Sequence, residues 1–296
     1  MTPRPCWHDE PCSAVVEPLT RTDFVRFAGA SGDFNPVHHD ETYARAHGFP
    51  SVFAMGMLVA GILADFVVCN AGIAYVRELQ MRFRSPIWPG DRLRLAASAR
   101  DQDRVDLVVT VDDSSRVSGS AVLGDLSGAA RPAAADAGPA EEHRELATVR
   151  LPVERGQIVQ FARAIKSSNE IHHTLDAAHG AGFADLVAPL LFTCTAAHWN
   201  GGDAADLVRQ VGLDLARVVH GEHAWRFQRP VVAGDLLEGR RWAGPARTVR
   251  SRSGKLLSTV AVVTHYSDAQ GAPVLAEQMT LIQTPACTLT AKGRAG

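Results

Sequence analysis

The chain has 296 residues, of which 46% are hydrophobic, and a formal net charge of −2. This length suits one large domain or two ordinary ones, and the apolar fraction excludes a largely disordered protein. Acidic and basic residues nearly balance, so no overall field attracts a polyanion and we expect no nucleic-acid partner.

The first half of the chain is predicted to contain two short helices, a long helix and a run of strands. A helix is predicted over 22–30, a loop over 32–37, where Pro36 disfavours helix, and a short helix over 40–47. The stretch over 55–69 is almost wholly apolar, which predicts a central, buried helix. Strand-like runs follow at 75–83, 92–100, 106–111 and 117–124.

A linker divides the chain. Residues 124–142 are rich in alanine, glycine, proline and acidic residues and show no hydrophobic period. We therefore divide the chain into 1–125, a linker over 126–145, and 146–296. The last part is predicted to repeat the first, with strands at 224–227, 235–242, 256–266 and 274–284. A buried helix followed by antiparallel strands, twice over, is an α+β arrangement.

An internal duplication supports this division. A shift of 134 positions places 27–58 on 161–192 without a gap, and roughly a third of the pairs are identical, including Asn35 with Asn169 and His38 with His172. A shift of 144 then places Arg82-Phe83 on Arg226-Phe227, and Gly90-Asp91 on Gly234-Asp235. The change of shift indicates an insertion, which we place in a loop around 200–206. Because Gly90-Asp91 recurs in both halves, we predict a turn there.

Features of targeting are not evident in the sequence. Residues 1–17 contain prolines and charges but no apolar run of signal-peptide length. The most apolar stretch, 52–71, contains Asp65 and is short of a membrane span, so we expect no membrane partner. The five cysteines are irregularly spaced, as small buried residues in a reducing compartment would be. These features predict a cytoplasmic protein.

The loop at 32–38 brings chemically active groups together. Asp33 and His38 lie five residues apart in a turn stiffened by Pro36, and a carboxylate and an imidazole so placed can hold one water between them. Downstream, free N–H groups at the start of the long helix can stabilise a developing oxyanion. Gly56 is the best candidate donor, because the missing Cβ permits close approach of a carbonyl oxygen.

These residues resemble the signature of the R-specific enoyl-CoA hydratases, also called hydratase 2 or MaoC-like proteins. The signature is Gly-Asp-x-Asn-Pro-aliphatic-His, five further residues and Ala; here it reads Gly32, Asp33, Asn35, Pro36, Val37, His38 and Ala44. Gly48-Phe49 and Gly56-Met57 are also similar to the family. The second half, over 161–189, resembles the non-catalytic partner subunits of type II fatty-acid synthase dehydratases.

The resemblance implies a tandem (double) hot-dog fold, each half a long central helix wrapped by a curved antiparallel β-sheet. It implies an acyl-CoA or acyl-carrier-protein thioester as substrate, and neither a metal nor another cofactor. Asp33 and His38 would activate water for syn addition to a trans-2-enoyl thioester, giving the R-3-hydroxyacyl product, or would catalyse the reverse dehydration. Asn35 would steady the loop, and Gly56 and Met57 would contact the thioester.

The chain departs from the family at two places. Met55 stands where the family commonly has His before Gly-Met, which alters the pocket but leaves the backbone donor in place. In the second half Ser167 replaces the catalytic Asp and Glu170 replaces the proline, so His172 is expected to lack its partner. We therefore expect one active site per chain, with the second half making room for the acyl chain.

Alternative interpretations remain open for several residues. Asp33 could be a capping or turn residue, and His38 a structural histidine. Arg82 and Arg84 could meet CoA phosphates or lie on a solvated strand face. A metal site is not expected, because the spacing of the histidines near His38 matches no standard ligand set.

Alternatives at the level of the whole protein are an acyl thioesterase of the same fold and a catalytically silent subunit that binds acyl thioesters. The two halves are expected to form a pseudo-dimer within one chain, which could associate further as a homodimer.

Overall fold

The computed structural model describes residues 11–126, 142–200, 204–251 and 254–284. The first half begins with strand β1 (Cys12–Val16) and helix α1 (Arg21–Ser31). Thr20 and Asp23 form a capping box at the start of α1. Gly32 ends the helix with a φ of 79°, in the left-handed region that favours glycine.

The long helix of this half follows a compact loop. The loop contains the 3₁₀ helix η2 (Pro36–His38) and helix α2 (Glu41–Ala46). Helix α3 (Gly56–Ala71) and the 3₁₀ helix η3 (Ile73–Tyr75) come next. Four strands complete the half at the predicted runs, although the last two begin earlier than expected: β2 (Val76–Phe83), β3 (Leu93–Ala99), β4 (Arg104–Val111) and β5 (Ser114–Leu123).

The second half repeats this order with one helix changed. Its amino-terminal elements are β6 (Arg144–Glu145), β7 (Val149–Pro152), α4 (Arg155–Ala164), the 3₁₀ helix η4 (Glu170–His172) and α5 (Leu175–Gly180). The 3₁₀ helix η5 (Phe192–Trp199), helix α6 (Ala204–Gln210) and the 3₁₀ helix η6 (Leu215–Arg217) follow. The remaining strands are β8 (Val218–Phe227), β9 (Leu236–Ala243), β10 (Arg247–Arg250), β11 (Leu256–Ser267) and β12 (Pro273–Gln283).

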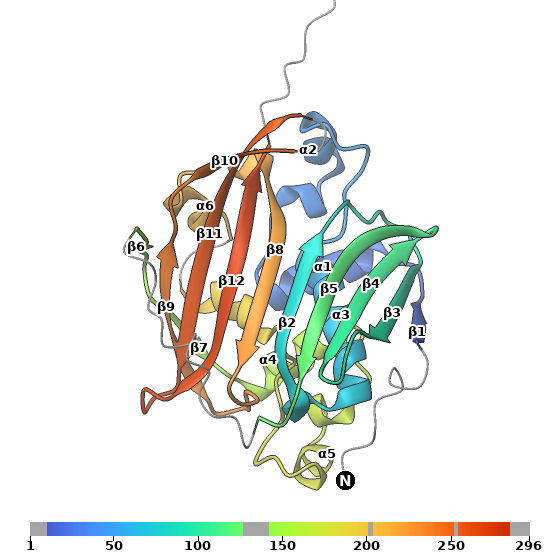
Figure 1. The fold of residues 1–296 in the computed structure, drawn as a ribbon, viewed down its shortest axis with the longest axis vertical. Helices are drawn as coiled ribbons and strands as arrows, with labels where there is room; N and C mark the ends of the chain where they lie inside the picture. Colours follow the sequence, from blue (N-terminus) through green and yellow to red (C-terminus); the bar gives the residue numbers. More distant parts are fainter. Residues whose placement is uncertain (1–10, 127–141, 201–203, 252–253, 285–296) are drawn as a thin grey trace, which may run out of the picture.

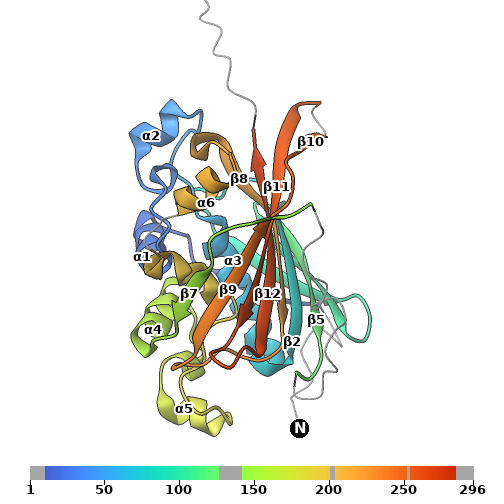
Figure 2. The same cartoon turned by 90° about the vertical axis from the view of Figure 1, so that its left-hand side faces the viewer.

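The strands of both halves join one antiparallel sheet. Its order is β1-β3-β4-β5-β2-β8-β12-β11-β9-β6, with β7 paired to β9 and β10 to β11. The halves meet where β2 pairs with β8, Leu79 opposite Trp225 and Met81 opposite His223 (Figure 1). The helices gather on one face of the sheet (Figure 2). The α+β tandem hot-dog architecture is thus confirmed, with a pseudo-dimer inside one chain.

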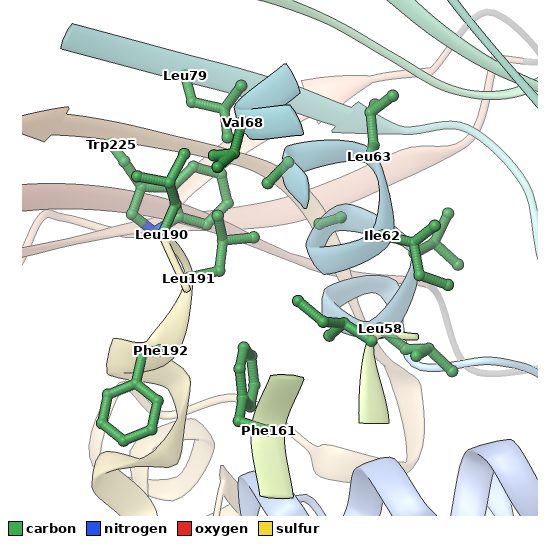
Figure 3. Close-up of a cluster of buried hydrophobic side chains, with 14 of the residues drawn as sticks. Leu58, Ile62, Leu63, Val68, Leu79, Phe161, Leu190, Leu191, Phe192 and Trp225 are labelled. Carbon is green, nitrogen blue, oxygen red and sulfur yellow. The ribbon is translucent and has the colours of Figure 1, made fainter. Parts of the chain in front are cut away.

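The larger of two hydrophobic clusters in the described residues crosses the boundary between the halves. Leu58 and Val68 of α3 belong to the same cluster of buried side chains as Phe161 of α4 and Trp225 of β8 (Figure 3). The rings of Phe27 and Phe161, equivalent positions of the duplication, lie 5.7 Å apart. Because the buried apolar surface is shared, its removal from water holds the two halves together.

The second half departs from the prediction that each half contains a long central helix. At the position equivalent to α3 the chain forms η5, a 3₁₀ helix of 8 residues. The segment contains β-branched Thr193 and Thr195, and Gly201-Gly202 follow it in sequence, which disfavours a long α-helix. The predicted loop around 200–206 is partly wrong, since α6 begins at Ala204; residues 201–203 lie outside the described ranges.

Several smaller predictions are wrong, or concern residues outside the described ranges. Strands β1, β7 and β10 were not predicted. The predicted linker, 126–145, falls mostly outside the described residues, and its last two residues form β6. The expectation of buried free thiols is wrong for Cys69, which is exposed, and for Cys12, which is disulfide-bonded; Cys194 is half-buried. Within the described ranges, no helix has the length and apolarity needed to cross a membrane.

Candidate active site

The predicted loop forms one wall of a cavity of about 490 Å³. Asp33, Asn35 and His38 line it together with Gly56 and Met57 at the amino end of α3. The opposite wall comes from the second half, from η5, α6 and the inward faces of β8, β9, β11 and β12. The cavity therefore extends from the first half into the space that a second long helix would have filled.

Local hydrogen bonds hold the loop in shape. The Asn35 amide donates to Asp33 Oδ1 at 3.2 Å, and Asn35 Oδ1 accepts from the Val37 amide at 3.3 Å. The Asp33 amide donates to Ser31 Oγ at 3.2 Å. Such side-chain turns are characteristic of Asp and Asn, and Pro36 stiffens the next position. Asn35 therefore occupies a position from which it steadies the loop.

His38 has a defined tautomer. Its Nδ1 lies 2.8 Å from the carbonyl oxygen of Phe53, and the Phe53 ring meets the imidazole edge-on. A carbonyl oxygen can only accept, so Nδ1 carries the proton and Nε2 keeps a free lone pair. Burial lowers the pKa of His38 below its ordinary value, although the charge of Asp33 opposes this. The imidazole is therefore neutral near pH 7.

Asp33 and His38 face each other at a distance suited to one bridging water. His38 Nε2 and Asp33 Oδ2 are 3.9 Å apart, too far for a direct hydrogen bond, and both atoms are acceptors. If a water oxygen lies about 2.8 Å from each of these two atoms, the angle between the directions to Nε2 and to Oδ2 is about 90°. This angle is close to the one between the two O–H bonds of the water. The pair can thus accept both protons of one water and orient its lone pairs.

The amino end of α3 offers hydrogen-bond donors to the same space. Among the described residues, no side chain caps this helix, whose N-cap is Met55. The amides of Gly56 and Met57 therefore remain available at the cavity wall. A Cβ on Gly56 would come within 3.2 Å of the Phe83 ring, so even a methyl group here would narrow the approach to these amides.

The two arginines proposed for CoA phosphates differ in position. Arg84 is exposed, lines the cavity, and its Nε donates to Ser118 Oγ at 2.9 Å. Arg82 forms an ion pair with Glu222 across the β2–β8 junction, and does not line the cavity in the described part of the chain. The geometry therefore favours Arg84 over Arg82 for a phosphate contact.

The second half contains a pair that sequence reasoning missed. His172 was expected to lack a carboxylate, but Asp65 of α3 supplies one: its Oδ1 accepts from Ser167 Oγ at 2.6 Å and lies 3.9 Å from His172 Nε2. His172 Nδ1 meets the Val187 carbonyl oxygen at 2.6 Å, as His38 meets that of Phe53. Asp65 comes from the other half, so only the tertiary fold could reveal it.

The pair formed by Asp65 and His172 is not accessible to a substrate. Burial lowers the pKa of His172 to about 4 and raises that of Asp65 above its ordinary value. The gap that both residues line has no space for a water molecule. A substrate therefore has no space beside His172, although the polar arrangement is present.

Two further histidines and the predicted turn have structural roles. His39 Nε2 lies 3.2 Å from the Phe34 carbonyl oxygen, and the equivalent His173 contacts the Ser167 carbonyl oxygen at 3.0 Å. The turn at Gly90-Asp91 is confirmed: Gly90 has a φ of 96°, and Asp91 accepts from the Trp88 amide at 2.8 Å.

A further set of polar residues was also missed. The cavity's second-half wall includes His220, His223, Arg241, Tyr266 and Glu277. The duplication could have revealed this cluster, because the shift of 144 places His223 on the apolar Leu79. A polar residue at a position that is apolar in the other half indicates a different environment.

Two families match the chain, one in each half. The family described as "MaoC like domain" matches residues 7–119, and the family described as "FAS1-like, dehydratase domain region" matches residues 143–277. A "UPF0336 protein" from Saccharopolyspora erythraea is 34% identical over 130 residues, which cover 44% of this chain and 80% of that protein.

Solved structures of similar fold cover nearly the whole chain. A MaoC domain protein from Chloroflexus aurantiacus superposes with a TM-score of 0.64 at 13% identity, over 96% of this chain and 98% of that one. A conserved hypothetical protein from Mycobacterium tuberculosis, described as having a double hotdog fold, gives a TM-score of 0.61 at 14% identity, over 94% and 98%. At such identities these neighbours establish the fold alone.

Proposed function

Because the chain belongs to the MaoC-like dehydratase family, we propose that it hydrates trans-2-enoyl thioesters to R-3-hydroxyacyl thioesters, or catalyses the reverse dehydration. One observation carries the proposal. Asp33 and His38 turn two free acceptor atoms toward each other, 3.9 Å apart, at the wall of a cavity large enough for an acyl chain.

The reaction starts from the water held between Asp33 and His38. One proton of this water passes to the pair while its oxygen bonds to C3 of the enoyl group. The π electrons move toward C2 and the thioester oxygen, and the proton held by the pair then bonds to C2 on the same face. The sum is the addition of one water, and dehydration follows the same steps in reverse.

The amides at the start of α3 stabilise the charge that develops on the thioester oxygen. Gly56 N–H is the proposed donor, assisted by the positive end of the α3 dipole. Asn35 keeps Asp33 in position, and Met57 contacts the acyl thioester. The Arg84 guanidinium is the proposed contact for a CoA phosphate at the cavity wall.

The two halves have different roles in this proposal. We place the active half at 1–125, the linker at 126–145 and the degenerate half at 146–296. The closed pair at Asp65 and His172 leaves one active site per chain, and the short η5 leaves space for the acyl group.

Hydration of crotonyl-CoA tests the proposal directly. Loss of the conjugated-thioester absorbance, with the R-3-hydroxy product identified by chiral analysis, is the expected result. A thiol reagent in a parallel assay reports free CoA, which only a thioesterase would release. Release of CoA without hydration, or binding of enoyl-CoAs of several lengths without any turnover, would refute the proposed reaction.

A further inference from the structure

The part of the cavity that extends into the second half contains a cluster of polar side chains among the apolar residues of its wall. Glu277 Oε2 accepts from Thr193 Oγ1 at 3.0 Å and lies 3.5 Å from His223 Nε2. Glu277 Oε1 accepts from the Tyr266 hydroxyl at 3.3 Å. His220 lies beside His223, with ring centroids 5.0 Å apart. All but one of these residues belong to strands of the sheet, which hold them in fixed positions.

The equivalent strands of the first half have apolar residues at the positions of this polar cluster. The shift of 144 that relates Arg82 to Arg226 places His220 on Val76, His223 on Leu79 and Arg241 on Ala97. These three first-half residues are buried and apolar. Both strands also carry a bulge, between Val76 and Glu78 in β2 and between His220 and Glu222 in β8, so the positions correspond in three dimensions.

The comparison of the halves separates a structural role from a binding role. In the first half this face of the sheet packs against α3; in the second half the short η5 leaves it open to the cavity. At these three positions the second half has polar residues where the first half has buried apolar ones, and all three line the cavity. A scaffold that needed only to be filled would keep the apolar residues.

Several buried atoms of this cluster lack a hydrogen-bond partner. Among the described residues, His220 Nε2, His223 Nδ1 and Arg241 Nε have none. Buried polar groups are nearly always paired, so unpaired ones beside a cavity indicate that a ligand supplies the partner. The Arg241 Nε–H can only donate, so it needs an acceptor. His223 Nε2 faces the Glu277 carboxylate, which only accepts, so the ring proton lies on Nε2 and the unpaired Nδ1 needs a donor. The missing partner therefore both accepts and donates, as a hydroxyl group does.

The charges of the cluster indicate a neutral ligand group. Burial raises the pKa of Glu277, but contacts with His223 and Thr193 and the charge of Arg241 outweigh this and hold it below its ordinary value. Burial and the neighbouring His223 hold the pKa of His220 well below its ordinary value. Glu277 is therefore ionised and balanced by Arg241, while His220 is neutral. A second carboxylate would face Glu277 without an extra cation.

The cluster lines the same cavity as the proposed reaction centre. Cys194 lines the cavity, and its thiol pKa is raised by burial and by the charges of both Glu277 and Asp33. Asp33, Cys194 and Glu277 all line this cavity, so a chain that reaches from one carboxylate toward the other stays inside it. An acyl chain attached to a thioester at Asp33 and His38 can follow this route.

We propose that His220, His223 and Arg241 form a subsite for a hydroxyl group carried on the acyl chain beyond the reacting C2–C3 bond. This inference rests on the proposed function, because it places the thioester end at Asp33 and His38. The substrate class is an acyl thioester with a second, neutral oxygen function, rather than a plain alkyl chain or a dicarboxylic one.

Binding of unreactive ligands tests the subsite independently of turnover. The probes are saturated medium-chain acyl-CoAs of one length: the plain chain, chains with one ketone or hydroxyl at successive carbons beyond C4, and the ω-carboxylate. Isothermal titration calorimetry on the full chain is expected to show at least one hydroxyl probe binding roughly tenfold or more tightly than the plain chain, and more tightly than the ketone at the same carbon.

Two variants remove the subsite by restoring the first-half residues, His220→Val and His223→Leu. Each is expected to bring the affinity ratio of the oxygenated to the plain probe close to one, and binding of the plain probe reports that the variant is folded. His265→Leu is the matched control, because His265 lies on the outer face of β11, packed against Trp242. Its ratio is expected to equal that of the wild type.

Three results would overturn the subsite: tightest binding of the plain chain, tightest binding of the ω-carboxylate, or a ratio unchanged in both cavity variants. Crotonyl-CoA hydration, assayed separately, distinguishes the two proposals. Hydration without a preference for oxygenated chains removes the subsite alone. A preference without hydration of any enoyl-CoA removes the proposed reaction alone.

Discussion

The substitution Asp33→Asn tests the proposed chemistry with little change of shape. In the folded chain Asp33 Oδ1 accepts from the Asn35 amide, so an asparagine is expected to keep its oxygen there. Its NH₂ group then takes the place of Oδ2, 3.9 Å from His38 Nε2. The position that accepted a water proton becomes a donor, and the water loses one of its two anchors.

The expected loss follows from the role of a general base. Such groups contribute about 10²–10⁴ in rate, or about 3–5 kcal/mol of transition-state stabilisation. We expect kcat for crotonyl-CoA hydration to fall at least about a hundredfold with little change in KM, because proton transfer occurs in the transition state. The double variant Asp33→Asn/His38→Ala should lose scarcely more, since both residues act on one water.

A matched control separates chemistry from loop structure. Asp40→Asn also changes an aspartate of this region, whose Oδ1 caps α2 by accepting from the Tyr43 amide at 3.0 Å, but it leaves the pair untouched. Its turnover should equal that of the wild type, and thermal unfolding of both variants should occur within a few degrees of it. An Asp33→Asn enzyme that keeps more than about a third of wild-type kcat would show that this carboxylate is not the base.

Three further predictions concern stability and binding. Gly61→Ala should lower the free energy of unfolding by about 1–2 kcal/mol in urea titrations, because the new Cβ would lie 2.6 Å from a side-chain carbon. Gly29→Ala should raise the free energy of unfolding by about 0.5–1 kcal/mol, because nothing lies within 4 Å of the new Cβ and alanine favours the helix. The pKa of His172 falls from 6.5 to about 4 on folding, so the unfolded chain binds the extra proton in that interval and stability should drop by up to about 3 kcal/mol between pH 6.5 and 4. A His172→Gln variant whose stability falls as steeply as that of the wild type would contradict this assignment. Arg84→Ala should raise KM for acyl-CoA several-fold at low salt with kcat unchanged, whereas Arg82→Ala should not; equal effects would contradict the geometric distinction between them.

Local features of the chain were predictable because they depend on near neighbours. The loop from Gly32 to His38 follows from a glycine at positive φ, a proline and two Asx turns, all within one short segment. The long helix follows from an almost wholly apolar stretch, and most strands follow from hydrophobic patterning. The same reasoning placed Asp33 and His38 within reach of one water, and the observed distance agrees with that expectation.

The short η5 was less predictable, since the duplication suggested a second long helix. The repeat aligns residues 27–58 with 161–192 and ends where η5 begins, so it contains no information on how the chain continues. The β-branched threonines and the following glycines were visible, but propensity is a weak guide when packing decides between helix types. The cavity exists because that packing leaves space.

What the sequence by itself determined is the pair of hot-dog halves, the Asp–Asn–Pro–His loop and the loss of the aspartate at Ser167. What only the tertiary structure decided is the carboxylate that replaced it and the polar cluster in the second-half wall of the cavity. Asp65 is 102 residues from Ser167 in the chain, and Glu277 is 84 from Thr193. Periodicity and motif spacing describe contacts within a few turns or strands. Contacts across such separations depend instead on how the two halves pack around their shared core.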